Sequence, residues 1–212
     1  SSSNVYFAKA IWERYGITGK KQEYSDFLHE KLHLGQTVGL ERLGERAPSI
    51  TTDWKVPDPG VMLVKMSYGY RVRLAPIQMI TFYNAIANGG KAAQPYLIQK
   101  TESALGILSL PRMTRHTGRL ISKKTAETVA ELMANNVEVT YGTKRFPNMQ
   151  LCAKSGTAEV GGDKKPHAWF AGLLQDEEHP YAFVVLVENG GGGNAVAGTV
   201  AGKVLDIIVN GY

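Results

Sequence analysis

The chain has 212 residues, of which 43% are hydrophobic and 20% are charged, and its formal net charge is +5. This composition is that of a folded globular protein and excludes a disordered tail. Basic residues are scattered, without a stripe interleaved with aromatic residues, which argues against nucleic-acid binding. The single cysteine, Cys152, excludes an internal disulfide and a cysteine-based metal cluster.

The first third of the chain combines two helical patterns with a long irregular stretch. Apolar residues at helical spacing predict a helix from Val5 to Tyr15, with Asn4 as its N-cap and Gly16 as its stop. A second helix is predicted over residues 24–34. Residues 35–75 are rich in glycine and proline and too long for a plain loop, so we expect short elements or functional residues there.

Three further helices are predicted from their end signals. One begins at Pro76 and ends at Gly89 or Gly90, because proline suits a first turn and glycine a left-handed cap. Ser122 and Asn194 are expected to cap the other two. The residues expected to share one face are, helix by helix, Ile77, Ile80, Tyr83 and Ala87; Ala126, Val129 and Met133; and Val196, Val200, Val204 and Ile208. Two glycines of the last helix would permit close backbone approach, namely Gly198 and Gly202.

Three strands are predicted before the last helix, at Gln150–Ala158, Ala168–Gln175 and Tyr181–Glu188. The polar turn at 176–180 predicts that the last two form an antiparallel hairpin. Their nearly continuous apolar character indicates that both faces are covered. The order of elements therefore predicts an α/β (α+β) sandwich, with an antiparallel sheet between helices, as part of a single domain over residues 1–212.

The stretch "AKSGT" at 153–157 places a lysine, two hydroxyls and a glycine at the end of an apolar strand. A phosphate-binding P-loop is excluded, because the glycines that it needs before the lysine are absent. Two interpretations remain open from these residues alone. Lys154 could be an exposed charge on an edge strand with Gly156 marking a bulge, or it could serve an anion-binding site.

A second motif, Ser2-x-Asn4, stands directly before the first helix. Taken alone, serine and asparagine at this place are ordinary helix caps. Ser-x-Asn followed much later by Lys-Ser-Gly on a strand, however, is the order found in serine enzymes that act on D-alanyl peptides and β-lactams. The stretches at 32–45, 66–90, 167–172 and 184–193 also resemble segments of these enzymes, in the same order along the chain. The chain resembles the C-terminal part of the transpeptidase domain of class B penicillin-binding proteins, the monofunctional D,D-transpeptidases.

The resemblance implies roles for three catalytic residues. The hydroxyl of Ser2 and the amine of Lys154 would sit beside the nucleophile and move its proton. Asn4 would donate its amide to the acyl chain of the substrate. These roles require that Ser2 and Asn4 lie against the strand that carries Lys154.

The resemblance also implies a substrate-binding strand edge. The hydroxyls of Ser155 and Thr157 would bind the free carboxylate of D-alanine or of a β-lactam, and the backbone N–H of Thr157 would form half of an oxyanion hole. Gly156 would keep the strand edge clear for the peptide. The family chemistry needs no cofactor and no metal.

The nucleophile of the family lies in a Ser-x-x-Lys motif, which this sequence lacks, because none of its ten serines is followed by lysine three positions later. We therefore expect the acylating serine in an N-terminal half of the domain outside this chain, which alone would be inactive. We also expect an unpaired apolar edge at Tyr181–Val187, covered by that half or by a second copy. The parent is expected to be anchored at the extracytoplasmic face of the bacterial membrane.

The expected function is thus part of a peptidoglycan D,D-transpeptidase, which cross-links D-Ala-D-Ala stem peptides through a serine acyl-enzyme and binds β-lactams. Two alternatives stay open. A serine β-lactamase relative would hydrolyse β-lactams rapidly, whereas a β-lactam sensor or scaffold domain would be acylated stably without exchanging peptides.

Overall fold

The computed structural model describes residues 2–40, 44–106, 109–111, 113 and 115–211. They form two units, each with a core of its own. The first unit comprises residues 1–78 and 94–115, and the second comprises residues 79–93 and 116–212. The predicted site residues are divided between these units, so each unit is described separately.

The first unit begins with two helices that each end in a π-helical turn. Helix α1 (Asn4–Ile11) runs into the turn Trp12–Gly16, and α2 (Lys21–Asp26) runs into the turn Phe27–Lys31. The first predicted helix is confirmed, whereas the second begins and ends three residues earlier than expected. The predicted cap is wrong by one position: the side chain of Ser3 accepts a hydrogen bond from the N–H of Tyr6 (3.2 Å), and Asn4 is already helical.

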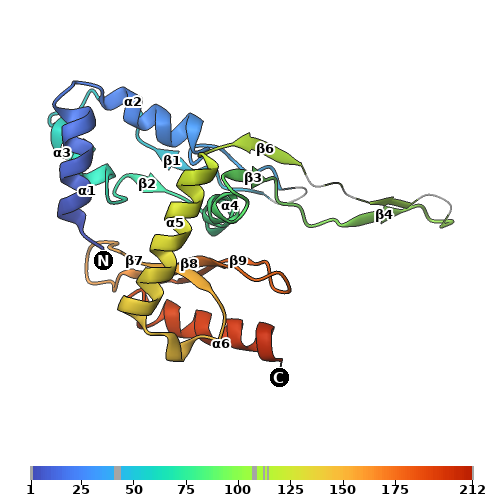
Figure 1. Cartoon of the computed structure of the whole chain (residues 1–212). Coiled ribbons are helices and arrows are strands. Elements are labelled where there is room, and N and C mark those ends of the chain that lie inside the picture. The colour runs from blue at the N-terminus through green and yellow to red at the C-terminus, as the bar shows by residue number, and fades with distance from the viewer. Residues whose placement is uncertain (1, 41–43, 107–108, 112, 114, 212) are drawn as a thin grey trace. The chain divides into compact units, whose positions relative to one another are not determined.

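Short elements occupy the long stretch after α2, as expected. Strands β1 (Ser49–Ile50) and β2 (Val72–Arg73) pair antiparallel, and helix α3 (Pro59–Met66) lies between them in sequence and beside α1 (Figure 1). Strands β4 (Lys100–Glu102) and β5 (Ser109–Pro111) form a further antiparallel pair. The core of this unit is small and consists of Tyr24, Ile50, Met62, Leu63 and Met66.

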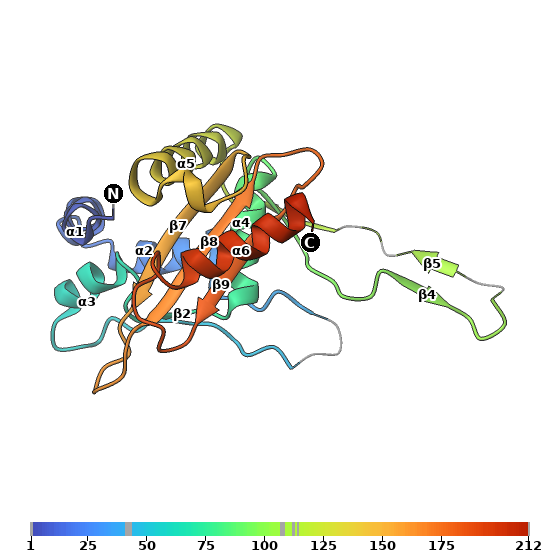
Figure 2. The ribbon, with the colours of Figure 1, turned by 90° about the horizontal axis from the view of Figure 1, so that it is seen from below.

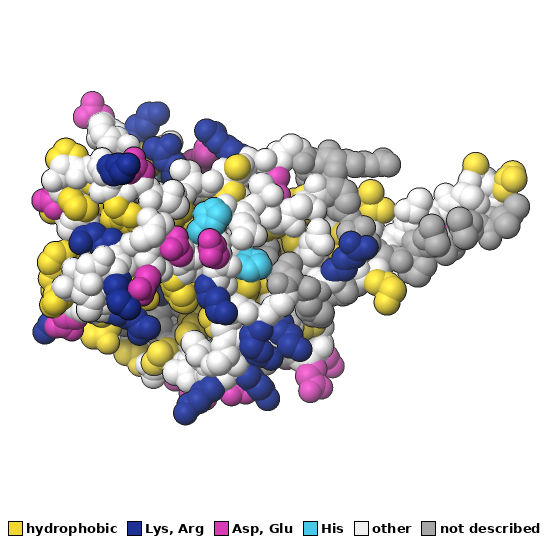
Figure 3. Space-filling model, turned by 90° about the horizontal axis from the view of Figure 1, so that it is seen from above, with side chains coloured by type: hydrophobic (Ala, Val, Ile, Leu, Met, Phe, Trp, Pro, Cys, Tyr) yellow, Lys and Arg dark blue, Asp and Glu magenta, His cyan; other side chains and the backbone are white. Residues whose placement is uncertain are grey.

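The first unit also leaves large apolar side chains in contact with solvent. No residue of α1 is buried. Apolar atoms (yellow) accordingly reach the surface at the left-hand end of Figure 3. The exposed apolar residues on α1 and α3 include Val5, Tyr6, Phe7 and Val61.

Helix α4 (Pro76–Ala87) begins at the predicted proline and leads into the second unit. It ends before Gly89 and Gly90, whose φ angles of 58° and 93° confirm the predicted glycine cap. The apolar residues that this helix buries are Tyr83, Ala85 and Ile86. The predicted face is wrong at Ala87, which is exposed in the last turn whereas Tyr83 is buried.

Helix α5 (Lys123–Asn136) follows a pair of short antiparallel strands, β3 (Lys91–Ala93) and β6 (His116–Arg119). Ser122 caps α5 as predicted, since its hydroxyl accepts the N–H of Thr125 at 3.0 Å. Ala126 and Met133 are buried, and Val129 packs beside them, as expected.

The main sheet has three antiparallel strands in the order β7 (Leu151–Ala158), β8 (His167–Leu174) and β9 (Ala182–Val187). All three predicted strands and the hairpin are confirmed to within one residue. The ladder between β7 and β8 runs from Leu151 opposite Leu174 to Ala158 opposite His167 without a register shift. The suggested bulge at Gly156 is therefore wrong. Within the described residues, β9 is an edge strand, and all six of its side chains are only half-buried.

Helices cover both faces of this sheet, as predicted (Figures 1 and 2). Side chains of successive strand residues point to opposite faces, so each strand contributes to two clusters. Helix α6 (Ala197–Asn210) packs on one face, against Phe170 and Leu174, and α4 and α5 pack on the other, against Cys152 and Leu173. The predicted mixture of helices with an antiparallel sheet is thus confirmed.

Helix α6 lies in its predicted place but buries a different face. Its buried residues are Ala197, Gly198, Ala201, Gly202 and Leu205. The larger residues on the predicted stripe face solvent instead, namely Val200, Val204 and Ile208, which are 40–46% exposed. The predicted cap is also wrong, because Val196 precedes the helix, and the Oδ1 of Asn194 accepts a hydrogen bond from Arg145 at 2.8 Å.

Candidate functional site

The Lys-Ser-Gly-Thr motif occupies the end of β7, where the strand leaves the core. Leu151, Cys152 and Ala153 are buried, residues 154–156 are half-buried, and Thr157 is exposed. The apolar start of the strand therefore anchors it between helices, while the polar end is presented to solvent. The sequence predicted this transition correctly.

β7 is also an edge strand in the described part of the chain, so half of its backbone groups face away from β8. The side-chain amide of Asn136 donates to the carbonyl of Ala153 on this free edge (3.3 Å). The ammonium of Lys154 donates to the carbonyl of Ser155. Lys154 is thus a half-buried cation held against the edge, and the interpretation of it as a fully exposed charge is wrong.

Ser155 is held by a tyrosine that sequence reasoning did not single out. The hydroxyl of Tyr141 accepts the backbone N–H of Ser155 at 2.7 Å and donates to its Oγ at 3.0 Å. Tyr141 ends a π-helical turn, Val137–Tyr141, that extends α5, and its ring packs edge-on against Phe170 with ring centroids 5.3 Å apart. No periodicity or motif in the sequence marks this tyrosine, because its partner lies 14 positions later.

Thr157 contacts the glycine-rich connection between β9 and α6. Its Oγ1 accepts the backbone N–H of Gly193 at 3.1 Å. Ser155 and Thr157 thus both accept hydrogen bonds within the described residues, and each retains its own hydroxyl proton for donation. Two hydroxyl donors and an ammonium near one strand edge are suited to binding a carboxylate.

Gly156 is not required by packing inside this chain. A Cβ built at this position would lie 3.4 Å from the Cβ of Trp169, close to ordinary van der Waals distance. The backbone of Gly156 pairs regularly with Trp169 and needs no positive φ. Among the described residues, packing therefore does not require glycine at position 156.

Ser2 and Asn4 belong to the first unit, whereas Lys154, Ser155, Gly156 and Thr157 belong to the second. Both Ser2 and Asn4 are exposed at the start of α1, and the capping role is filled by Ser3. Their side chains form no hydrogen bond to any described residue and stay available. The structure thus brings together the four predicted residues on β7 and leaves the Ser-x-Asn pair in a separate unit.

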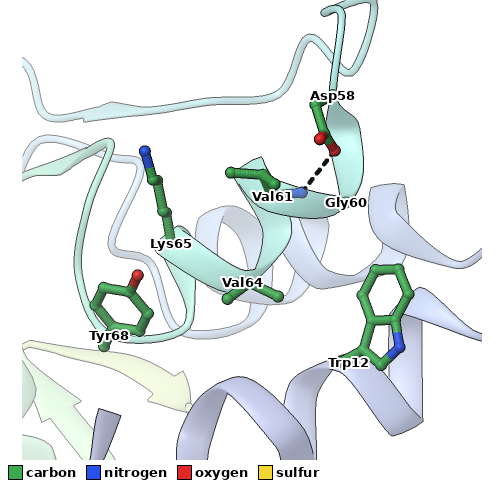
Figure 4. A pocket seen from close by; sticks show the side chains of 7 residues that line it. All are labelled: Trp12, Asp58, Gly60, Val61, Val64, Lys65 and Tyr68. Carbon is green, nitrogen blue, oxygen red and sulfur yellow. Dashed lines mark hydrogen bonds between the residues drawn. The ribbon is translucent and has the colours of Figure 1, made fainter. Parts of the chain in front are cut away.

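A pocket of about 340 Å³ lies between the turn that begins at Trp12 and helix α3, within the first unit (Figure 4). Trp12 forms one wall, Val64 lies between the ends, and Lys65 and Tyr68 stand at the other end. None of the predicted site residues lines this pocket. Among the described helices, none combines the length and apolarity that crossing a membrane requires.

Residues 1–206 match the penicillin-binding protein transpeptidase domain. The chain belongs to this transpeptidase family. It is 34% identical over 183 residues to the peptidoglycan D,D-transpeptidase PbpA of Mycolicibacterium smegmatis. That alignment covers 76% of this chain and 36% of PbpA. It is 28% identical over 240 residues to MrdA of Haemophilus influenzae, covering 99% of this chain and 35% of MrdA.

The fold of this transpeptidase-family chain agrees with the match. The ceftriaxone acyl-enzyme of penicillin-binding protein A from Mycobacterium tuberculosis superposes with a TM-score of 0.76 at 25% identity, over 92% of this chain and 45% of that one. A D,D-transpeptidase domain from Eggerthella lenta gives a TM-score of 0.75 at 21% identity over 99% of this chain, which supports the fold alone. The chain spans about a third of the length of the curated relatives.

Proposed function

We propose that this chain is part of a bacterial peptidoglycan D,D-transpeptidase, which cross-links D-Ala-D-Ala stem peptides through a serine acyl-enzyme and is acylated by β-lactams. The observation that carries the proposal is the free edge of β7, where Lys154 and the hydroxyls of Ser155 and Thr157 come together in a chain of this family. The relatives named as D,D-transpeptidases and the β-lactam acyl-enzyme of penicillin-binding protein A support it.

In this proposal the strand edge binds the substrate carboxylate. The hydroxyls of Ser155 and Thr157 donate to it, and the ammonium of Lys154 favours the anion electrostatically. The peptide lies along the edge beside Gly156, and the N–H of Thr157 stabilises the oxyanion that develops during acyl transfer. The absence of any packing demand at Gly156 supports a role in leaving room for the peptide.

We propose that proton transfer is carried out by the hydroxyl of Ser2 and the amine of Lys154. The amide of Asn4 is proposed to orient the acyl chain. The order of the two motifs in a chain that matches the family over residues 1–206 supports this assignment. Because the sequence holds no Ser-x-x-Lys, the acylating serine is proposed to come from a further segment of the transpeptidase domain. The edge of β9 is proposed to be covered either by that segment or by a second copy of this chain. The protein is proposed to act outside the cytoplasmic membrane, where stem peptides are found.

Labelling with a fluorescent penicillin tests the proposal. The 212-residue chain alone should form no covalent adduct by mass spectrometry, whereas a transpeptidase that contains this segment should form one. Lys154→Ala in that enzyme should slow acylation by about 100-fold or more, because a positioned proton-transfer group is lost. Lys164→Ala, which removes an exposed lysine from the loop after β7, should leave acylation unchanged.

Three outcomes would contradict the proposal. An adduct on the chain alone would place the nucleophile among these residues. Rapid turnover of penicillin by the complete enzyme would identify a β-lactamase. Stable acylation without exchange of a D-Ala-D-Ala peptide would identify a sensor or scaffold.

A further inference from the structure

Tyr141 is a buried residue with a short connection to the proposed carboxylate site. Its side chain is 8% exposed, and Phe170 and Leu151 lie in the same apolar cluster. Its hydroxyl nevertheless reaches the free edge of β7 and makes both hydrogen bonds to Ser155 described above. A tyrosine hydroxyl offers one proton and accepts through its oxygen, so this pair of bonds uses the proton and one acceptor position.

The two bonds determine what the hydroxyl of Ser155 can still do. Because the proton of Tyr141 points to the Oγ of Ser155, that oxygen acts as an acceptor there. The hydroxyl proton of Ser155 then remains available to a ligand. A carboxylate accepts hydrogen bonds and donates none, so this arrangement favours an anionic ligand over a neutral donor.

The same tyrosine also occupies part of the strand edge. Outward backbone groups recur at every second residue of a strand, so Ala153, Ser155 and Thr157 face the same way. The side-chain amide of Asn136 donates to the carbonyl of Ala153, and the hydroxyl of Tyr141 accepts the N–H of Ser155. Neither of these backbone groups is then available to pair with a peptide. The N–H of Thr157 is the next outward donor along the strand, and no described side chain or loop carbonyl hydrogen-bonds to it.

We propose that Tyr141 is a positioning residue for the transpeptidase site: it orients the hydroxyl of Ser155 toward the ligand carboxylate and ends the open edge of β7, so that a bound D-alanyl peptide pairs with the strand only from Thr157 onward. This inference rests on the proposed function. In this inference, the position at which a bound peptide begins to pair with β7 is set by Tyr141, a buried residue that does not itself touch the substrate.

The test uses a transpeptidase that contains this segment and compares a penicillin with its methyl ester, which lacks the carboxylate charge. Tyr141→Phe keeps the ring that packs on Phe170 and removes only the hydroxyl. The second-order rate of acylation by the penicillin should fall about tenfold, the effect of losing a hydrogen bond to a buried polar group. Acylation by the ester should change by less than about twofold, because the carboxylate contact is absent from that reaction.

Tyr24→Phe is the control, since Tyr24 is likewise a buried tyrosine but belongs to the core of the first unit, and no hydrogen bond among the described residues joins it to β7. It should leave both rates unchanged. In the 212-residue chain, the amide resonance of Ser155 should shift in Tyr141→Phe while the resonances of α6 stay in place, which shows that the variant is folded.

The outcomes separate this inference from the proposed function. If the unmodified enzyme forms no adduct with either compound, the proposed function fails and the inference falls with it. If the enzyme is acylated, and Tyr141→Phe slows acylation by the penicillin and by its ester equally or changes neither rate, only the positioning role is refuted. An unchanged Ser155 resonance would refute it as well.

Discussion

At the residue scale, the candidate site combines contiguous residues, which a sequence can reveal, with distant partners, which it cannot. Lys154, Ser155 and Thr157 follow one another on a predicted strand, so their common location on β7 followed from the strand assignment. Tyr141 and Gly193 reach the same residues across 14 and 36 positions of sequence, and only the fold brings them there. The sequence therefore predicted which groups could bind an anion, but not which groups hold them in place.

Cys152, beside the motif, provides a test of the burial of β7. Burial raises the pKa of its thiol from 9.0 to about 11. The neutral thiol is favoured in the folded state, so its contribution to stability is complete below pH 9 and declines as the pH rises toward 11. At pH 8 the folded chain should react far more slowly with a disulfide reagent than the chain in denaturant.

Absorbance of the released thiolate measures both rates on one sample. Equal rates for folded and denatured chain would show that the start of β7 is open to solvent, contrary to the described packing of Cys152 between α4 and α5.

At the element scale, predictions based on end signals succeeded more often than predictions based on side-chain size. Pro76, Ser122 and the glycines after α4 mark helix ends where expected, because their backbone chemistry acts locally. On α6 the stripe of large apolar residues that the spacing predicts is not the buried face, because Val200, Val204 and Ile208 are exposed and the small residues beside them are buried. A Cβ at Gly202 would lie 2.4 Å from the carbonyl oxygen of Arg145, so close approach selects small residues for the buried side.

The edge of β9 carries a prediction of its own. Its residues are apolar throughout and contain no lysine to discourage pairing with another strand. Leu186 lies on this strand and belongs to neither apolar cluster of the second unit. Leu186→Lys should therefore reduce self-association of the 212-residue chain without a large loss of thermal stability.

Analytical ultracentrifugation at several concentrations measures this effect. Leu132→Lys replaces a leucine that is 65% exposed on helix α5 and is not part of β9, and it should leave self-association unchanged. An equal effect of both substitutions would indicate general surface hydrophobicity rather than pairing at the β9 edge.

At the scale of the whole molecule, the two units differ in how their cores are built. The second unit has a sheet packed on both faces, with two large clusters of buried residues. The first unit has short helices around a cluster of five buried apolar residues, and helix α1 buries none of its own. Residues of the Ser-x-Asn motif therefore start a helix whose local support is small, whereas the Lys-Ser-Gly-Thr strand is anchored in the larger core.

Amide hydrogen exchange followed by mass spectrometry should reflect this difference. Peptides from β7 and β8 should exchange slowest, because opening them disrupts both clusters, and peptides from α1 and α2 should exchange faster by about two orders of magnitude or more. Slower exchange in α1 than in β8 would contradict this assignment of stability.

The glycine run at 190–193 has uneven requirements along its length. A side chain at Gly193 would begin 2.2 Å from the carbonyl oxygen of Gly156, whereas one at Gly192 would meet nothing nearer than 3.9 Å. Natural variants of this connection should therefore tolerate replacement at the third glycine and reject it at the fourth. Because the N–H of Gly193 donates to the Oγ1 of Thr157, a side chain at Gly193 should also displace the exposed end of β7, whereas one at Gly192 should leave it in place.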